Sequence, residues 1–113
     1  MTYTTTQSGD VSIVRIGDAR VGYPMLGGFS IAVSALVAAG HRHIVVDLTP
    51  VTYVDSATIG CLMDLYRQAR AAGGALKLSG VQKRVETMLT MTGAQHFLEI
   101  HGDEQSAIAS FGG

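Results

Sequence analysis

The chain has 113 residues, of which 47% are hydrophobic and 15% are charged, and its formal net charge is −1. This composition argues against disorder and suffices for one domain with its own core. It provides no general attraction for nucleic acid, and the basic residues are too scattered to form a patch (Arg67, Lys77, Lys83, Arg84). We therefore expect a single domain over residues 1–113 that does not bind nucleic acid directly.

Nothing in the sequence predicts export or membrane insertion. Residues 1–8 are polar and rich in threonine, unlike a secretory signal. The apolar run at residues 25–39 contains glycine and serine and is shorter than the about 20 residues that cross a bilayer. The single cysteine, Cys61, is consistent with a reducing compartment. We expect a cytoplasmic protein with no membrane insertion.

The first half of the chain predicts two strands around one helix. Residues 11–16 are rich in β-branched side chains and predict a buried strand. Pro24 can start a helix whose apolar residues repeat at helical spacing, and Gly40 ends it. Residues 44–48 are almost continuously apolar, which is typical of a central strand covered on both faces.

In the second half, a helix is expected to begin near Ser56 and to stop at Gly73-Gly74. Its predicted core-facing stripe is Ile59, Leu62, Met63, Tyr66 and Ala69. Further along, the pattern predicts a strand at residues 75–79, a helix ending at Gly93, a short strand at residues 96–100 and a last helix around residues 107–111. This alternation predicts an α/β fold: a mixed β-sheet of about four to five strands, with helices packed mainly on one face.

The sequence contains no motif typical of a metal site, a phosphate-binding loop or a catalytic site. The four histidines (His41, His43, His96, His101) and the lone cysteine do not have metal-ligand spacing. The glycine pairs lack the pattern of a phosphate-binding loop. No histidine lies near Ser56 in sequence, although the fold can bring one close. We expect no catalytic residues, no metal and no cofactor.

The pair Asp55-Ser56 is the strongest candidate, because an apolar strand delivers it to the start of an amphipathic helix. One of the two side chains is expected to accept hydrogen bonds from the free backbone N–H groups there. The same position can also present a serine hydroxyl for phosphorylation. Small residues in the first turn, such as Ala57 and Gly60, would let a partner approach the backbone closely.

A family resemblance rests on three motifs in order: DSATIG at residues 55–60, LMDLYRQARAAGGALKLSGV at 62–81 and LTMTG at 89–93. Over residues 10–111 the chain resembles the STAS domain family and, within it, the bacterial anti-sigma-factor antagonists. Their motif is typically Asp-Ser-Ser/Thr-Gly-Leu-Gly. Here Ala57 and Thr58 replace the second hydroxyl residue and the first glycine, and Gly17-Asp18-Ala19-Arg20 replaces an early Gly-Glu-Leu-Asp signature.

The resemblance implies a protein-interaction switch rather than an enzyme. It maps the phosphoacceptor onto Ser56, with Thr58 as the second choice. The unphosphorylated domain would bind an anti-sigma factor that is also a serine protein kinase, phosphorylation would release it, and a phosphatase would reset it. ATP and magnesium would belong to the kinase. The alternative is a STAS docking subunit of a stress-signalling complex or of a membrane transporter ATPase.

The expected partner surface follows from the start of the helix and its outward face. Beside Ser56, Gly60 would permit close approach, while Asp64 and Arg67 would form a charged rim or simply pair with each other at i, i+3 spacing. The full predicted surface is Asp55, Ser56, Ala57, Thr58, Gly60, Asp64 and Arg67.

Overall fold

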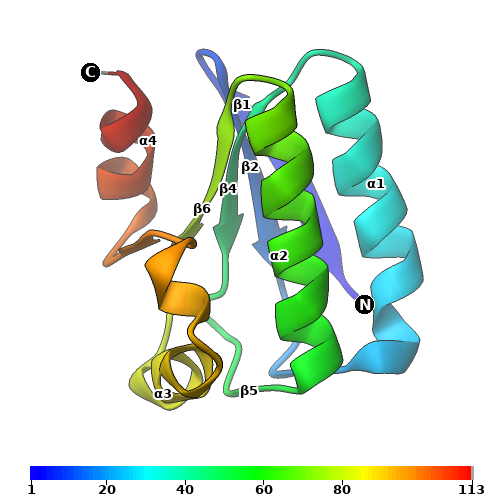
Figure 1. Cartoon of the computed structure of the whole chain (residues 1–113), viewed down its shortest axis with the longest axis vertical. Coiled ribbons are helices and arrows are strands. Elements are labelled where there is room, and N and C mark those ends of the chain that lie inside the picture. Colours follow the sequence, from blue (N-terminus) through cyan, green and yellow to red (C-terminus); the bar gives the residue numbers. More distant parts are fainter. Residues whose placement is uncertain (113) are drawn as a thin grey trace.

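The computed structural model describes residues 1–112, and its strands and helices alternate along the chain (Figure 1). The strands are β1 (Tyr3–Ser8), β2 (Val11–Ile16), β3 (Arg20–Val21), β4 (His43–Asp47), β5 (Tyr53–Val54), β6 (Ala75–Ser79) and β7 (Ile100–His101). The helices are α1 (Leu26–Ala38), α2 (Ser56–Ala71), α3 (Lys83–Thr92) and α4 (Glu104–Gly112), with short 3₁₀ turns η1 (Tyr23–Met25) and η2 (Ala94–His96).

The main sheet has five strands in the order β1-β2-β4-β6-β7. The β1 strand runs antiparallel to β2, and the other neighbours are parallel. A second small sheet pairs β3 with β5 in parallel, beside the start of α2. The prediction of a mixed α/β sheet is therefore confirmed.

The central strand β4 shows why its sequence is apolar throughout. Ile44 and Val46 point into the larger core, under α1, α2 and α3, whereas Val45 packs in a smaller cluster beneath α4. Neighbouring strands alternate in the same way, because successive side chains of a strand point to opposite faces. In Figure 1, α1 and α2 lie side by side on one side of the sheet and α4 lies on the other. The helices thus pack mainly on one face, as predicted.

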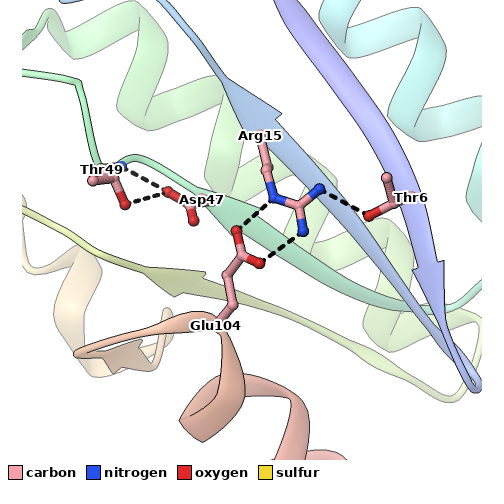
Figure 2. Close-up of polar contacts among 5 residues, drawn as sticks. All are labelled: Thr6, Arg15, Asp47, Thr49 and Glu104. Atoms are coloured by element: carbon pink, nitrogen blue, oxygen red, sulfur yellow. Dashed lines mark hydrogen bonds and ion pairs between the residues drawn. The ribbon is translucent and has the colours of Figure 1, made fainter.

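Polar contacts hold α4 against the second face of the sheet (Figure 2). The guanidinium of Arg15 donates two hydrogen bonds to the carboxylate of Glu104, at 2.7 and 2.8 Å, and a third to Thr6. At the other end of the helix, the amine of Lys77 lies 4.3 Å from the centre of the Phe111 ring, which also stacks on His43. Lys77 is only 7% exposed as a result.

The strands at residues 11–16 and 75–79 have the predicted bounds, and the helices start and stop close to the predicted residues. The short edge strand predicted at residues 96–100 is present as β7, but it is shorter than predicted and begins later. Residues 94–96 form a 3₁₀ turn after Gly93, whose positive φ of 79° redirects the chain, and only Ile100–His101 pair with β6. The polar edge strand β1 was not predicted.

Within residues 1–112, no helix is both long and apolar enough to cross a membrane.

Candidate functional site

The start of α2 is capped by Asp55 rather than by Ser56. Asp55 has extended backbone angles, and its carboxylate accepts a hydrogen bond from the backbone N–H of Thr58 at 2.8 Å. An aspartate at this position satisfies an N–H that has no partner within the helix, and its charge faces the positive end of the helix dipole. The cap, which the sequence left open between Asp55 and Ser56, is therefore Asp55.

The same carboxylate ties the helix to the preceding segments. Its second oxygen accepts a hydrogen bond from the backbone N–H of Tyr23 at 2.9 Å. Gly22 permits this contact, because a Cβ atom there would lie only 3.1 Å from that oxygen. The hydroxyl of Thr58, then the Thr58 and Tyr23 backbone N–H groups, hold the pKa of Asp55 below its ordinary value against a small opposing effect of burial.

Thr58 lies beneath the surface of this turn. It is 3% exposed, and its hydroxyl oxygen is 2.6 Å from the Asp55 carboxylate and 3.1 Å from the carbonyl oxygen of Val21. The residue that replaces the glycine of the family motif thus adds a side chain to the cap and links α2 to β3. Its position differs from that of a side chain presented to a partner.

Ser56, by contrast, is exposed at the first position of α2. Its hydroxyl forms no hydrogen bond with any residue in the range 1–112. Because Asp55 already accepts the N–H of Thr58, the serine is not needed as a cap. The turn therefore presents a free hydroxyl at the positive end of a helix dipole, next to a carboxylate.

A groove of about 510 Å³ runs alongside this turn, between η1–α1 and the first half of α2. It is lined by Tyr23, Pro24, Leu26, Gly27, Ser30, Ala57, Cys61 and Asp64. Tyr23 is 73% exposed at its rim. Burial raises the pKa of the Cys61 thiol, which disfavours the reactive thiolate. Neither Tyr23 nor this groove was predicted from the sequence, in which only Pro24 marked the nearby start of a helix.

The outward face of α2 carries Gly60, Asp64 and Arg67, all exposed. Asp64 accepts a hydrogen bond from Gln68 at 3.2 Å, and no ion pair joins it to Arg67 within the described chain. The core-facing stripe is rotated slightly from the prediction: Leu65 is fully buried, whereas Met63 and Tyr66 are only half-buried. The side chains of Met63 and Tyr66 pack against the edge of the core rather than inside it.

The histidines do not gather into a site. Among residues 1–112, no three histidine, cysteine, aspartate or glutamate side chains are arranged to hold a metal ion. His43 instead stacks on Phe111, with ring centres 4.8 Å apart, and His101 lies 3.1 Å from a carboxylate oxygen of Glu99.

Comparisons with known proteins agree with this architecture. A structure of an anti-sigma-factor antagonist (STAS) domain protein from Planctomyces limnophilus has a TM-score of 0.89 and 15% identity, over 98% of each chain. The anti-sigma factor antagonist SpoIIAA of Bacillus, solved unphosphorylated and phosphorylated, has a TM-score of 0.75 and 16% identity in the unphosphorylated form, over 99% of each chain.

A third likeness is to part of a membrane protein. The murine anion transporter Slc26a9 matches 95% of this chain with 18% of its own, at a TM-score of 0.79 and 16% identity. At these identities the likenesses establish the fold. The STAS domain family model matches residues 4–107, nearly the whole chain. The chain therefore belongs to the STAS domain family.

Proposed function

We propose that this domain is a phosphorylation-switched anti-sigma-factor antagonist. Unphosphorylated, it binds an anti-sigma factor that is also a serine protein kinase; phosphorylation of Ser56 releases it, and a phosphatase restores binding. The observation that carries the proposal is that Asp55 alone caps α2, which leaves the neighbouring Ser56 hydroxyl exposed and without a hydrogen bond in residues 1–112. ATP and magnesium belong to the kinase, and we assign the domain itself a cytoplasmic binding role without catalysis.

The proposal draws further support from the relatives, since SpoIIAA is an anti-sigma factor antagonist that has been solved in a phosphorylated form. The buried position of Thr58 also favours Ser56 over the second candidate hydroxyl, because a kinase must reach the acceptor. The groove beside Ser56 and the exposed face of α2 offer a continuous surface for the partner.

A phosphate on Ser56 would act mainly on binding. It adds about −1.5 to −2 charges at pH 7. Next to a helix N-terminus this charge stabilises the helix by about 0.3–1 kcal/mol, offset in part by repulsion from Asp55. In a complex the same dianion must lose water against the partner, and like charges brought together there cost several kcal/mol. Since each 1.4 kcal/mol is about a tenfold change in affinity, this suffices for release.

The test is incubation with the cognate kinase and ATP, followed by intact-mass measurement and peptide mapping. We expect one phosphate on Ser56 of the wild-type chain and none on Ser56→Ala. Ser56→Thr is the matched control, because it retains an acceptor hydroxyl at the same position.

Two results would contradict the proposal in different ways. Phosphate found mainly on Thr58 would refute the assigned acceptor and leave the switch in place. No phosphorylation, together with equal binding of the partner by wild type and Ser56→Asp, would favour the fixed docking subunit of a stress-signalling complex or of a membrane transporter ATPase.

A further inference from the structure

We propose that the C-terminal half of α2 binds an acidic segment of a partner protein that carries a bulky apolar side chain. The surface is a groove of about 410 Å³ lined by Met63, Tyr66, Arg67, Arg70 and Phe97, which we call the arginine groove. It lies beyond the groove next to Ser56 and shares no residue with it. The proposal concerns the chemistry of a partner and does not require that Ser56 be phosphorylated.

The floor of the arginine groove is apolar and open to solvent. Phe97, which follows η2, is 55% exposed, and its ring centre lies 6.4 Å from that of Tyr66 on α2. Met63 completes this wall with an unbranched, adaptable side chain. The exposed phenylalanine and the half-buried tyrosine and methionine together form an apolar surface that can contact a bulky apolar side chain of a partner. Such side chains often contribute most of the binding energy of a protein interface.

The rim of the groove is positive and unneutralised. Arg67 and Arg70 are both exposed and lie three residues apart, on the same face of α2. No carboxylate within residues 1–112 approaches either guanidinium to 4.0 Å, and Asp64 is engaged by Gln68 instead. Guanidinium groups pair best with carboxylates, with which they form two parallel hydrogen bonds. Glutamate or aspartate flanking an apolar residue therefore complements both parts of this surface.

Other occupants fit less well. A nucleic acid would need a longer basic stripe, whereas the chain as a whole has a net charge of −1. A second copy that docked groove to groove would bring the same arginines of both chains together across a two-fold axis, which is electrostatically unfavourable. An acidic segment needs no long basic stripe and brings no like charges together.

The arginine groove lies on the same side of α2 as Ser56. Arg67 follows Ser56 by eleven residues, close to three turns, so the two lie within about 20° of each other around the helix and about 16 Å apart along it. A partner seated at Ser56 can therefore extend an acidic segment along the helix to the arginine groove.

The experiment is an NMR titration of the full chain with 12-residue peptides that carry leucine, phenylalanine or tryptophan between aspartate and glutamate residues. Matched peptides have alanine at the centre or lysine at the flanks. We expect saturable binding of the acidic apolar peptides, with shifts at the Met63 methyl group and the Tyr66 and Phe97 rings. The double variant Arg67→Glu/Arg70→Glu should bind them about tenfold more weakly and should gain binding to the lysine-flanked peptides.

Two matched controls isolate the surface. Arg84→Glu makes the same charge change at an exposed arginine of α3 outside the groove. Ile31→Ser removes an apolar side chain from α1 that is even more exposed than Phe97, 72% against 55%. Both should bind the acidic peptides like wild type, whereas Phe97→Ser should not.

Binding of acidic and lysine-flanked peptides with equal affinity, or no saturable binding, would overturn the proposal. So would self-association through the groove, seen by sedimentation and relieved by Phe97→Ser, or displacement of the peptides by a single-stranded oligonucleotide. Phosphorylation of Ser56, measured on the same samples, tests the proposed function separately.

Discussion

At the scale of single residues, Asp55 and Ser56 have separate roles although they are adjacent. The carboxylate of Asp55 accepts hydrogen bonds from two segments, Thr58 in α2 and Tyr23 in η1. Ser56 has none of these contacts and remains exposed. The cap can therefore hold the turn in place whatever happens at the serine hydroxyl.

Replacing Asp55 by alanine should reduce the free energy of unfolding by about 1 kcal/mol at pH 7, the typical effect of losing an aspartate cap. The effect should depend on pH. The pKa of Asp55 in the folded protein lies below the ordinary value of 3.8, so its contribution is complete above that value and is lost as the pH falls through the folded-state pKa. Urea denaturation of both proteins between pH 7 and pH 2.5 measures this difference.

The matched control for this prediction is Asp10→Ala, since Asp10 is exposed and accepts no hydrogen bond from residues 1–112. Its free energy of unfolding at pH 7 should lie within about 0.5 kcal/mol of the wild-type value. A difference between wild type and Asp55→Ala that stayed constant down to pH 2.5 would mean that the carboxylate charge plays no part in the cap.

The roles of Asp55, Ser56 and Thr58 could be predicted from the sequence only where they depend on neighbouring residues in the chain. The motif placed a cap and a hydroxyl at the start of the helix, but either Asp55 or Ser56 could serve as the cap. The choice depends on Tyr23 and Val21, which lie more than thirty positions away in sequence and reach the turn through the β3–β5 pairing. The burial of Thr58 has the same long-range origin.

At the scale of elements, α2 is the helix that divides the core from the proposed partner surface. Gly60 lies on its outward face, and a Cβ atom added there would meet no atom within 4 Å apart from the neighbouring backbone of its own helix. A larger side chain is therefore compatible with the folded domain. It would project directly into any partner that docks beside Ser56.

Gly60→Arg should fold at least as stably as wild type, because arginine favours a helix by about 0.8 kcal/mol more than glycine does. It should nevertheless lose most of its binding to the partner kinase, since the side chain occupies the space needed for close approach. Thermal unfolding and calorimetric titration measure the two effects. Gly60→Ala is the control: it shares the gain in helix propensity without the bulk. Unchanged binding by Gly60→Arg would place the interface elsewhere.

The α4 helix gives an element-scale prediction on the opposite face. Phe111 stacks on His43 and covers the amine of Lys77. Phe111→Ala should lower the free energy of unfolding by about 1–2 kcal/mol, less than for a fully buried phenylalanine because Phe111 is only partly buried. It should also speed amide hydrogen exchange in α4. Ile31→Ala, which shortens a highly exposed side chain of α1, should change neither measurement. Equal exchange in Phe111→Ala and wild type would mean that other contacts hold α4.

The elements that the sequence predicted well are those with strong periodic patterns. Residues 11–16 and 75–79 are apolar strands, and α2 has clear start and stop signals. The β1 strand escaped prediction because its threonine-rich side chains are mostly exposed, so its place depends on pairing with β2 rather than on burial. At residues 96–98, backbone hydrogen bonds run back to Gly93 and Ala94 within the turn, so pairing with β6 begins only at Glu99.

At the scale of the whole molecule, the two faces of the sheet serve different purposes in our proposal. The face under α1, α2 and α3 holds the larger core and positions Ser56, whereas α4 closes the other face through Arg15, Lys77 and Phe111. No backbone rearrangement is needed to make the serine reachable. Release of a partner can then follow from a local change of charge, without a change in the backbone.

Phosphorylation of Ser56 should therefore leave the fold intact while it weakens binding. We expect the phosphorylated chain to unfold within a few degrees of the unmodified protein, because a charge at a helix N-terminus changes stability by no more than about 1 kcal/mol. Amide NMR shifts should change near residues 22–24 and 55–60 and remain the same in α4. Partner affinity should fall by one to two orders of magnitude, about 1.4–2.8 kcal/mol. Calorimetry on matched phosphorylated and unmodified samples measures both quantities. A large drop in melting temperature, or shift changes throughout the sheet, would mean instead that the phosphate acts by disrupting the fold.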